Sequence, residues 1–331
     1  MEKNGDKPNQ KIHALNDTQN CQQITDQQAG ITIKFGNIDN YYIVERIGRG
    51  KYSTVFLGRT IKDQPCVLKV LKPVSITKIN KEIKILEELK GGPNVCQLYD
   101  VVFDSESQSI TLVMEYIESL DFRVLYEQLT LADVKFYTYN ILKCLRYAHS
   151  KGVMHRDIKP QNIMIDHYRK KLAIIDWGLA DHYNLNAQYH VRVATVHYKA
   201  PELLLSYPYY NFAVDIWGLG CTFASMLFKR FPFFRGRDNN EMLLRISSFI
   251  DGALIIQYAE KLSLQIPQNL QSKITDRRKK TWEDLKNEKN ENMYDPLALD
   301  LLSKMLTIDH TDRITANDAI NHPFFDDVRD L

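Results

Sequence analysis

The sequence predicts an α+β protein in two parts, a small antiparallel sheet with one main helix followed by a larger, mostly helical part. Short strand-like segments separated by turns fill the first third of the chain. Apolar residues at helical spacing dominate after about residue 118. The chain has 331 residues, of which 44% are hydrophobic, so each part can bury a core of its own.

The first part contains four strand patterns and one helical pattern. The expected strands are residues 42–47, 54–57, 66–71 and 110–115. Gly48-Arg49-Gly50 is expected to form the turn between the first two strands. Residues 78–89 have helical spacing, which places four apolar side chains on one side of the helix: Ile79, Ile83, Leu86 and Leu89.

The second part contains four helical patterns, at residues 130–149, 210–228, 239–250 and 296–305. The polar segment 271–292 is expected to be an exposed insert. Residues 1–30 carry few apolar side chains, so we expect a mobile arm there. The expected domain boundaries are therefore a polar arm at 1–30, the sheet part at 31–117 and the helical part at 118–328.

Composition narrows the class of partner and the compartment. A formal net charge of +2 gives no reason to expect nucleic acid as a partner. No apolar run approaches the roughly 18 residues of a membrane span, and the first 28 residues lack the apolar core of a secretory signal. Five scattered cysteines without a C-x-x-C pair fit reduced thiols, so we expect the cytoplasm or nucleus. Arg277-Arg278-Lys279-Lys280 is either a nuclear import signal or a solvated charged face.

The most informative motif is His155-Arg156-Asp157-Ile158-Lys159-Pro160-Gln161-Asn162, followed by Asp176-Trp177-Gly178. Phosphoryl transfer needs a proton acceptor for the attacking hydroxyl, a cation near the transferred phosphate and oxygen ligands for metal ions. Asp157 is the candidate acceptor, and Lys159 can neutralise charge on the γ-phosphate. Asn162 and Asp176 are the candidate Mg²⁺ ligands, because Mg²⁺ favours oxygen donors.

A glycine-containing segment between the first two strands is the candidate phosphate-binding loop. Glycines let a backbone approach phosphates closely, although a G-x-G alone is also common in ordinary hairpin turns. Ser53 stands where the phosphate-binding pattern G-x-G-x-x-G-x-V has its third glycine. The candidate nucleotide-binding residues of this segment are Ile47, Gly48, Arg49, Gly50, Lys51, Tyr52, Ser53, Thr54 and Val55.

Lys69 is flanked by apolar residues in the third expected strand, and a lysine in such surroundings needs a partner to stay charged. Its expected partner is Glu82 on the following helix. In this interpretation Lys69 holds the α- and β-phosphates, whereas the alternative is a lysine that snorkels from a strand edge. Two further features are expected to have a structural role. Glu202 is expected to pair with Arg313, and a helix beginning near Asp215 is expected to brace the catalytic loop.

Together these residues resemble the signature set of the eukaryotic protein kinases, over about residues 42–325. A narrower set is similar to the catalytic α subunit of casein kinase 2, and Trp177 is characteristic because most kinases have phenylalanine there. The segments that carry the narrower resemblance are residues 48–53, 71–74, 82–86, 91–94, 164–167 and 176–180.

The resemblance implies a bilobal kinase fold and transfer of phosphate from ATP, and also from GTP, to Ser or Thr among acidic residues. It implies that adenine sits between Val55, Val67, Met164 and Ile175, against the linker that contains Glu115 and Ile117. It also implies a docking face for a regulatory β subunit on the outer side of the sheet, around Val44, Phe56 and Val70.

The chain departs from that family at two basic sites. Residues 75–81 read Ser-Ile-Thr-Lys-Ile-Asn-Lys where the family has a dense lysine run, and Val196 stands where it has an arginine. Arg192 and Lys199 remain as the substrate-binding cations, so we expect a weakened preference for acidic substrates. Two alternatives stay open: a pseudokinase, which the complete set of motif residues argues against, and a proline-directed kinase, suggested by residues 197–202.

Overall fold

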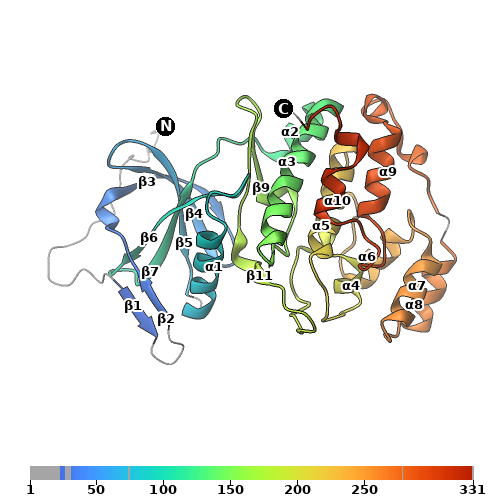
Figure 1. Cartoon of the computed structure of the whole chain (residues 1–331), viewed down its shortest axis with the longest axis horizontal. Helices are drawn as coiled ribbons and strands as arrows, with labels where there is room; N and C mark the ends of the chain where they lie inside the picture. The colour runs from blue at the N-terminus through green and yellow to red at the C-terminus, as the bar shows by residue number, and fades with distance from the viewer. Residues whose placement is uncertain (1–22, 27–30, 74, 278, 330–331) are drawn as a thin grey trace, which may run out of the picture. The chain divides into compact units, whose positions relative to one another are not determined.

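The computed structural model describes residues 23–26, 31–73, 75–277 and 279–329 (Figure 1). The chain divides into two compact units, one made of residues 1–91 and 95–117 and the other of residues 92–94 and 118–331. The first unit carries the antiparallel sheet and one helix, and the second carries the remaining α-helices of the described residues. The predicted α+β class is therefore confirmed.

The sheet of the first unit has five antiparallel strands in the order β3-β4-β5-β7-β6. Their bounds are β3 (Tyr41–Arg49), β4 (Ser53–Thr60), β5 (Pro65–Leu71), β6 (Leu98–Asp104) and β7 (Ser109–Glu115). Strand β6 was not expected from the sequence. Its register shifts between Leu98 and Asp100, and such an irregularity breaks the alternation by which a strand is recognised.

The glycine turn lies two residues later than predicted. Gly48 and Arg49 still belong to β3, where they pair with Val55 and Thr54 of β4. The Gly50 N–H donates to the Ser53 carbonyl at 2.8 Å and closes the turn over residues 50–53. The prediction was wrong here because a register shift between Arg46 and Gly48 adds a residue to β3 before the turn.

One face of this sheet carries a cluster of buried apolar side chains. Cys66, Leu68, Val102 and Val113 form a cluster that is at most 1% exposed, and burial raises the pKa of the Cys66 thiol to about 11. Phe56, expected on the docking face, packs against this cluster. Successive side chains of a strand point to opposite faces, so Lys69 lies on the face opposite Leu68.

The helix of the first unit, α1 (Ile76–Glu88), lies against β2 and β6 and buries Ile79, Ile83 and Leu86, as the spacing predicted. Strands β1 (Gln23–Asp26) and β2 (Ile31–Lys34) form a separate antiparallel pair. The expected mobile arm is therefore wrong at residues 23–26, where pairing with the alternating strand β2 orders a polar segment. The rest of the arm, including Cys21, lies outside the described residues.

The second unit is built around α5 (Ala213–Phe228), all 16 residues of which are buried. It packs against α2, α3 and α9, and α3 also contacts α10 (Figure 1). Helix α3 begins with a capping box between Thr130 and Asp133. The other helices are α2 (Phe122–Gln128), α3 (Leu131–Ser150), α4 (Pro201–Leu204), α6 (Asn239–Ile246), α7 (Gly252–Lys261), α8 (Gln268–Thr275), α9 (Pro296–Met305) and α10 (Ala316–Ile320).

Two helices are shorter than predicted. Helix α5 begins at Ala213, because the Asn211 side chain accepts the Ala213 N–H at 2.9 Å and forms a turn just before the helix. Helix α6 ends at Ile246, since the hydroxyls of Ser247 and Ser248 donate back to the Leu244 carbonyl and the chain turns away. No helix within the described ranges is both long and apolar enough to cross a membrane.

Most of the segment 271–292 is exposed, as predicted, but a few of its side chains anchor it to the core. It contains the end of α8, and Ile274 and Asn290 are fully buried. Trp282 stacks against Phe228 and Phe249 at centroid distances of 5.7 and 5.9 Å. Ile274, Trp282 and Asn290 anchor the segment, and its otherwise polar sequence gave no indication of this.

Candidate active site

The central group of the second unit is the carboxylate of Asp157, which is 6% exposed and accepts hydrogen bonds on both oxygens. Lys159 Nζ donates to its Oδ2 at 2.6 Å and to Thr195 Oγ1 at 2.8 Å. The Thr195 N–H and hydroxyl donate to Oδ1 at 2.8 and 3.0 Å. The structure thus brings Asp157 and Lys159 together, as the motif suggested, and adds Thr195 as a third member.

Asn162 lies beside this group, in a short 3₁₀ turn (Pro160–Asn162) before β9 (Ile163–Asp166). Its Nδ2 donates to the Asp157 carbonyl at 2.9 Å and to Oδ2 at 3.2 Å. The amide is thereby oriented with Oδ1 as its acceptor atom. The Ile175 N–H donates to the Asn162 carbonyl at 2.9 Å, which places Asp176, the next residue in the chain, near Asn162 in space.

Asn162 and Asp176 can supply one amide and one carboxylate oxygen, the donor type that Mg²⁺ prefers. Asp176 is exposed and has a left-handed backbone, with φ 61°, an uncommon conformation for a residue other than glycine. No group of three or more His, Cys, Asp or Glu side chains within the described ranges is arranged to hold a metal ion. Two protein oxygens are the number expected where phosphates and waters complete a magnesium shell.

Asp215, at the start of α5, holds the backbone of this loop from within the core. Its carboxylate accepts the N–H groups of His155 and Arg156 at 2.8 and 2.7 Å and a bond from His149 at 2.9 Å. Burial acts to raise the pKa of Asp215, but the hydrogen bond and charge of His149 and the bonds of the loop hold it below its ordinary value. The predicted bracing helix is therefore confirmed in detail.

Gly218, one turn further along α5, packs directly under the loop. A Cβ at this position would lie 2.7 Å from the Ile158 carbonyl oxygen, so any larger residue would push the two segments apart.

Arg156 connects the loop to the segment that follows Asp176. Its φ of 68° is strained for a non-glycine residue, and the Asp215 bond to its N–H fixes that conformation. The guanidinium donates to the Leu179 carbonyl at 2.7 Å and to the Tyr210 hydroxyl at 3.0 Å, and it pairs with Asp181 at 3.1 Å. Arg156 therefore ties two separate segments, residues 179–181 and the region of Tyr210, to the backbone beside Asp157.

Trp177 is fully buried in the second unit. Its indole N–H donates to the Ile174 carbonyl at 3.1 Å, and its ring meets the His155 ring edge-on at 4.7 Å. A buried tryptophan is stable when its N–H finds such an acceptor. The residue thus packs the base of the Asp176 turn against the catalytic loop.

Lys69 and Glu82 of the first unit form the expected pair. Lys69 Nζ lies 2.7 Å from Glu82 Oε1, with the side chains 12% and 8% exposed. Lys69 comes from the middle of β5, between Val55 of β4 and Leu112 of β7. A charged pair this enclosed has a fixed geometry, as a phosphate-binding cation requires.

The glycine turn has room for an outside group. A Cβ added at Gly48 or Gly50 would make only ordinary contacts of 3.5 and 3.7 Å with the chain itself, so the described chain does not demand glycine there. Lys72, which the motif reading missed, donates from Nζ to the Gly50 carbonyl at 2.6 Å. Ile47 and Tyr52 are about half exposed, at 48% and 53%.

The other candidate nucleotide contacts are divided between the units. Glu115 and Ile117 end β7 and the first unit, and the Glu115 N–H donates to the Gln97 carbonyl at 2.9 Å. Met164 of β9 pairs with Ala173 of β10 (Lys171–Ile174) in the second unit. The contact of these residues with adenine stays a prediction.

A model of the protein kinase domain family matches residues 41–325. This chain belongs to the protein kinase family. It is therefore a phosphotransferase with protein substrates, and the match takes in residues of both units. Protein kinases in general hold two Mg²⁺ ions through an asparagine and an aspartate and place a lysine on the nucleotide phosphates.

Two cations of the kinase lie in the segment expected to meet substrate. Arg192 is exposed, and Lys199 is half-buried, which lowers its pKa. Neither forms an ion pair with any residue that the structure describes. Both are therefore available to an acidic ligand.

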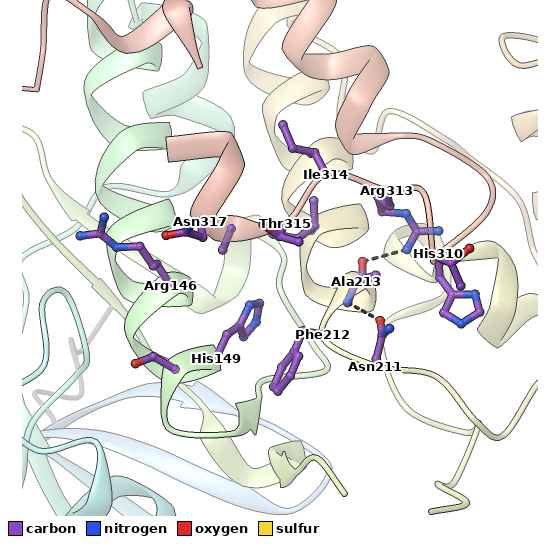
Figure 2. A pocket seen from close by; sticks show the side chains of 14 residues that line it. Arg146, His149, Asn211, Phe212, Ala213, His310, Arg313, Ile314, Thr315 and Asn317 are labelled. Carbon is purple, nitrogen blue, oxygen red and sulfur yellow. Dashed lines mark hydrogen bonds between the residues drawn. The ribbon is translucent and has the colours of Figure 1, made fainter. Parts of the chain in front are cut away.

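The end of this segment is anchored by Glu202 and Arg313, which form the predicted pair. Arg313 donates to the two carboxylate oxygens of Glu202 at 2.8 and 2.9 Å, and both side chains are fully buried. Figure 2 shows Arg313 also bonded to the Ala213 carbonyl, at 2.8 Å, beside a pocket of about 550 Å³ that His149 lines as well. Arg313, which pairs with Glu202, and His149, which bonds to Asp215, therefore line the same pocket.

The sequence motifs did not predict three residues that link the site to the rest of the protein: His149, Tyr210 and Lys72. His149 and Tyr210 carry no recognisable motif, and only their bonds to Asp215 and Arg156 reveal a role. Lys72 follows β5 closely, and its proximity in sequence to Lys69 was the one available signal.

Proposed function

We propose that this kinase transfers the γ-phosphate of ATP to serine or threonine hydroxyls of proteins. The arrangement of Asp157, Lys159 and Thr195 carries the proposal. A carboxylate with donors on both oxygens is fixed in orientation, so it can align a hydroxyl and accept its proton. Lys159 bridges that carboxylate and Thr195, where its charge can act on the phosphate during transfer.

Each unit supplies candidate groups for the nucleotide and its metal ions. Lys69, fixed by Glu82, would pair with the α- and β-phosphates, and the turn at Gly48 and Gly50 would cover them. Asn162 and Asp176 would hold Mg²⁺, which neutralises charge that develops on the phosphates. A side chain at Gly48 or Gly50 would fit within the protein itself. We therefore infer that glycine serves there to let the backbone approach a phosphate closely.

The acidic preference follows from the remaining cations. Arg192 and Lys199 would attract acidic residues near the acceptor, while Val196 and the uncharged positions of residues 75–81 remove part of that attraction. We therefore propose a casein-kinase-2-like enzyme with a weakened acidic preference, able to use GTP as a second donor. A regulatory β subunit, if one binds, would dock on the outer face of the sheet near Val44, which is 39% exposed.

A peptide panel tests the proposal. Purified kinase is given labelled ATP or GTP and three matched peptides: a serine followed by acidic residues, the same serine among neutral residues, and a Ser-Pro peptide. We expect transfer from both nucleotides, with the acidic peptide favoured only severalfold. Preference for the Ser-Pro peptide would indicate a proline-directed kinase. Transfer to tyrosine alone would contradict the proposal, and nucleotide binding without any transfer would indicate a pseudokinase.

A further inference from the structure

A second, smaller pocket of the kinase, of about 120 Å³, lies between the segment after α5, the end of α6 and the segment after α8. Its buried lining consists of Phe233, Phe234, Phe249 and the backbone turn at Ser248. A cavity of this size accommodates several waters or one tetrahedral oxyanion. Its other lining residues are all cationic: Arg230, Arg235, Arg245, Arg277 and Lys280.

Within the described chain, only one of the five cations of this basic pocket is paired with a carboxylate. None of its lining residues is acidic. Arg245 pairs with Glu241 at 2.8 Å, whereas the other four cations form no ion pair with any described residue. Five positive charges around one small cavity repel each other, so an anion bound there would be stabilised by all of them.

Arg230 shows that repulsion most clearly. Its guanidinium lies 5.9 Å from the centre of the Phe233 ring, which keeps it over the apolar part of the pocket. Burial lowers the pKa of Arg230, and the charge of Arg245 lowers it further. A partly buried cation beside another cation, with no carboxylate near it, is the environment of a residue that awaits an anionic ligand.

The pocket is fixed by main-chain bonds, so its geometry does not depend on long side chains. The Lys280 N–H donates to the Ser248 carbonyl at 2.7 Å and joins the segment after α8 to the end of α6. The Arg230 N–H donates to the Ser225 carbonyl at 3.3 Å at the end of α5. The first of these bonds joins residues that are 32 positions apart in the chain, so lining residues from separate segments meet at one site.

The basic pocket borders the segment expected to meet substrate. Burial lowers the pKa of His197 and the charge of Arg235 adds to that shift, while a hydrogen bond to the Gly236 backbone opposes it. His197 is therefore a direct neighbour of the pocket rim. Lys199 follows two residues later in the chain.

We propose that the basic pocket binds the phosphate group of a phosphorylated protein segment. Arginine suits this ligand, because its planar group pairs with two phosphate oxygens at once. A phosphoserine carries nearly two negative charges and three acceptor oxygens, more than a carboxylate offers to five cations. The assignment of this phosphorylated segment to a substrate rests on the proposed function. The binding of the phosphate group to the pocket does not depend on it.

Binding is measured without nucleotide, so that no phosphate transfer takes place. A fluorescein-labelled glycine-rich peptide with one phosphoserine is titrated with the full chain, and its anisotropy is compared with that of the unphosphorylated peptide. Two variants, Arg230→Gln and Lys280→Gln, each remove one pocket cation. Arg237→Gln is the matched control, because Arg237 lies close by in the chain and is 93% exposed but does not line the pocket.

We expect the phosphopeptide to bind at least about tenfold more tightly than its unphosphorylated form. Each pocket variant should weaken it about tenfold, and the control variant less than about twofold. Equal binding of both peptides, or an equal loss in Arg237→Gln, would overturn the proposal. Inorganic phosphate that binds as tightly as the phosphopeptide would overturn the assignment to a protein segment.

A second readout separates this proposal from the proposed function. A phosphorylated substrate peptide should show a KM about tenfold higher with Lys280→Gln, at unchanged kcat, than with the unaltered kinase. If the kinase transfers phosphate but that KM does not move, the pocket does not serve substrate. If it transfers none and still binds the phosphopeptide, the proposed function fails and the pocket stands. Lys280 is exposed, so its variant remains informative even if Arg230→Gln does not fold.

Discussion

Asp215→Asn tests how the kinase supports its catalytic loop. The wild-type carboxylate accepts three hydrogen bonds, from the N–H groups of His155 and Arg156 and from the His149 ring. The side chain is 0% exposed, so water cannot replace a lost bond. Asparagine has the same shape but turns one acceptor oxygen into an NH₂ group that faces a donor.

The cost follows from these bonds. Losing one hydrogen bond to a charged acceptor costs about 1.5–3 kcal/mol, and a stranded buried N–H adds about 1–3 kcal/mol. We therefore expect a loss of about 3–5 kcal/mol. For a unit of roughly 150–250 residues this lowers the melting temperature by about 6–20 °C. The strained φ of Arg156 would be held less firmly, so kcat should fall as well.

Scanning calorimetry at neutral pH and steady-state kinetics measure the two effects. Asp238→Asn is the matched control, because Asp238 caps α6 through the Glu241 N–H and asparagine caps a helix equally well. A melting temperature of Asp215→Asn within about 2 °C of the wild type, together with full kcat, would refute the reasoning.

The pH dependence of the same pair of proteins has a definite sign. The pKa of Asp215 is held below its ordinary value, so its ionised form stabilises the folded kinase above the unfolded pKa of about 3.9. That contribution disappears as the pH falls through the folded pKa. The melting-temperature gap between wild type and Asp215→Asn should therefore narrow below about pH 4, and a gap that widens on acidification would contradict the assignment.

Four further single variants and one double variant extend the test. Glu202→Leu and Arg313→Met should each cost about 3–5 kcal/mol in calorimetry, but the double variant should cost much less than their sum, since it leaves no buried charge unpaired; simple additivity would count against the pair. Lys69→Met should lower kcat/KM at least about a hundredfold with an unchanged circular dichroism spectrum, and near-normal turnover would remove Lys69 from the phosphate site. Lys199→Gln should raise KM for the acidic peptide a few fold at constant kcat, whereas an unchanged ratio of acidic to neutral peptide would show that Lys199 does not contact acidic residues.

Local spacing explains which parts of the site were predictable. Asp157, Lys159 and Asn162 lie within six residues, so the motif alone defines their neighbourhood. Thr195 reaches the same carboxylate from 38 positions away, and Asp215 reaches the loop from 60 positions away. Such long-range partners carry no periodic signal. The brace at Asp215 was expected from the motif set, but the individual hydrogen bonds of Asp215 and Thr195 are visible only in the folded chain.

The same contrast holds for the fold. Helix α9 was predicted to the residue because Pro296 marks its start and apolar side chains recur through Met305. The exposure of the segment 271–292 was predicted, but its anchors, Trp282 and Asn290, were not, because they stand alone in a polar sequence. Whether such an isolated side chain becomes buried depends on residues far away in the sequence, such as Phe228 for Trp282. The local sequence carries no information about those residues.

Transfer of labelled phosphate from ATP to protein serine, by the full chain and by its Asp157→Asn variant, tests the central claim most directly. Equal melting temperatures and equal nucleotide binding would establish that both proteins are folded. We predict that the wild type phosphorylates serine and that the variant is slower by about 10²–10⁴-fold, the usual share of a general base. Equal rates in the two proteins would contradict the role assigned to Asp157.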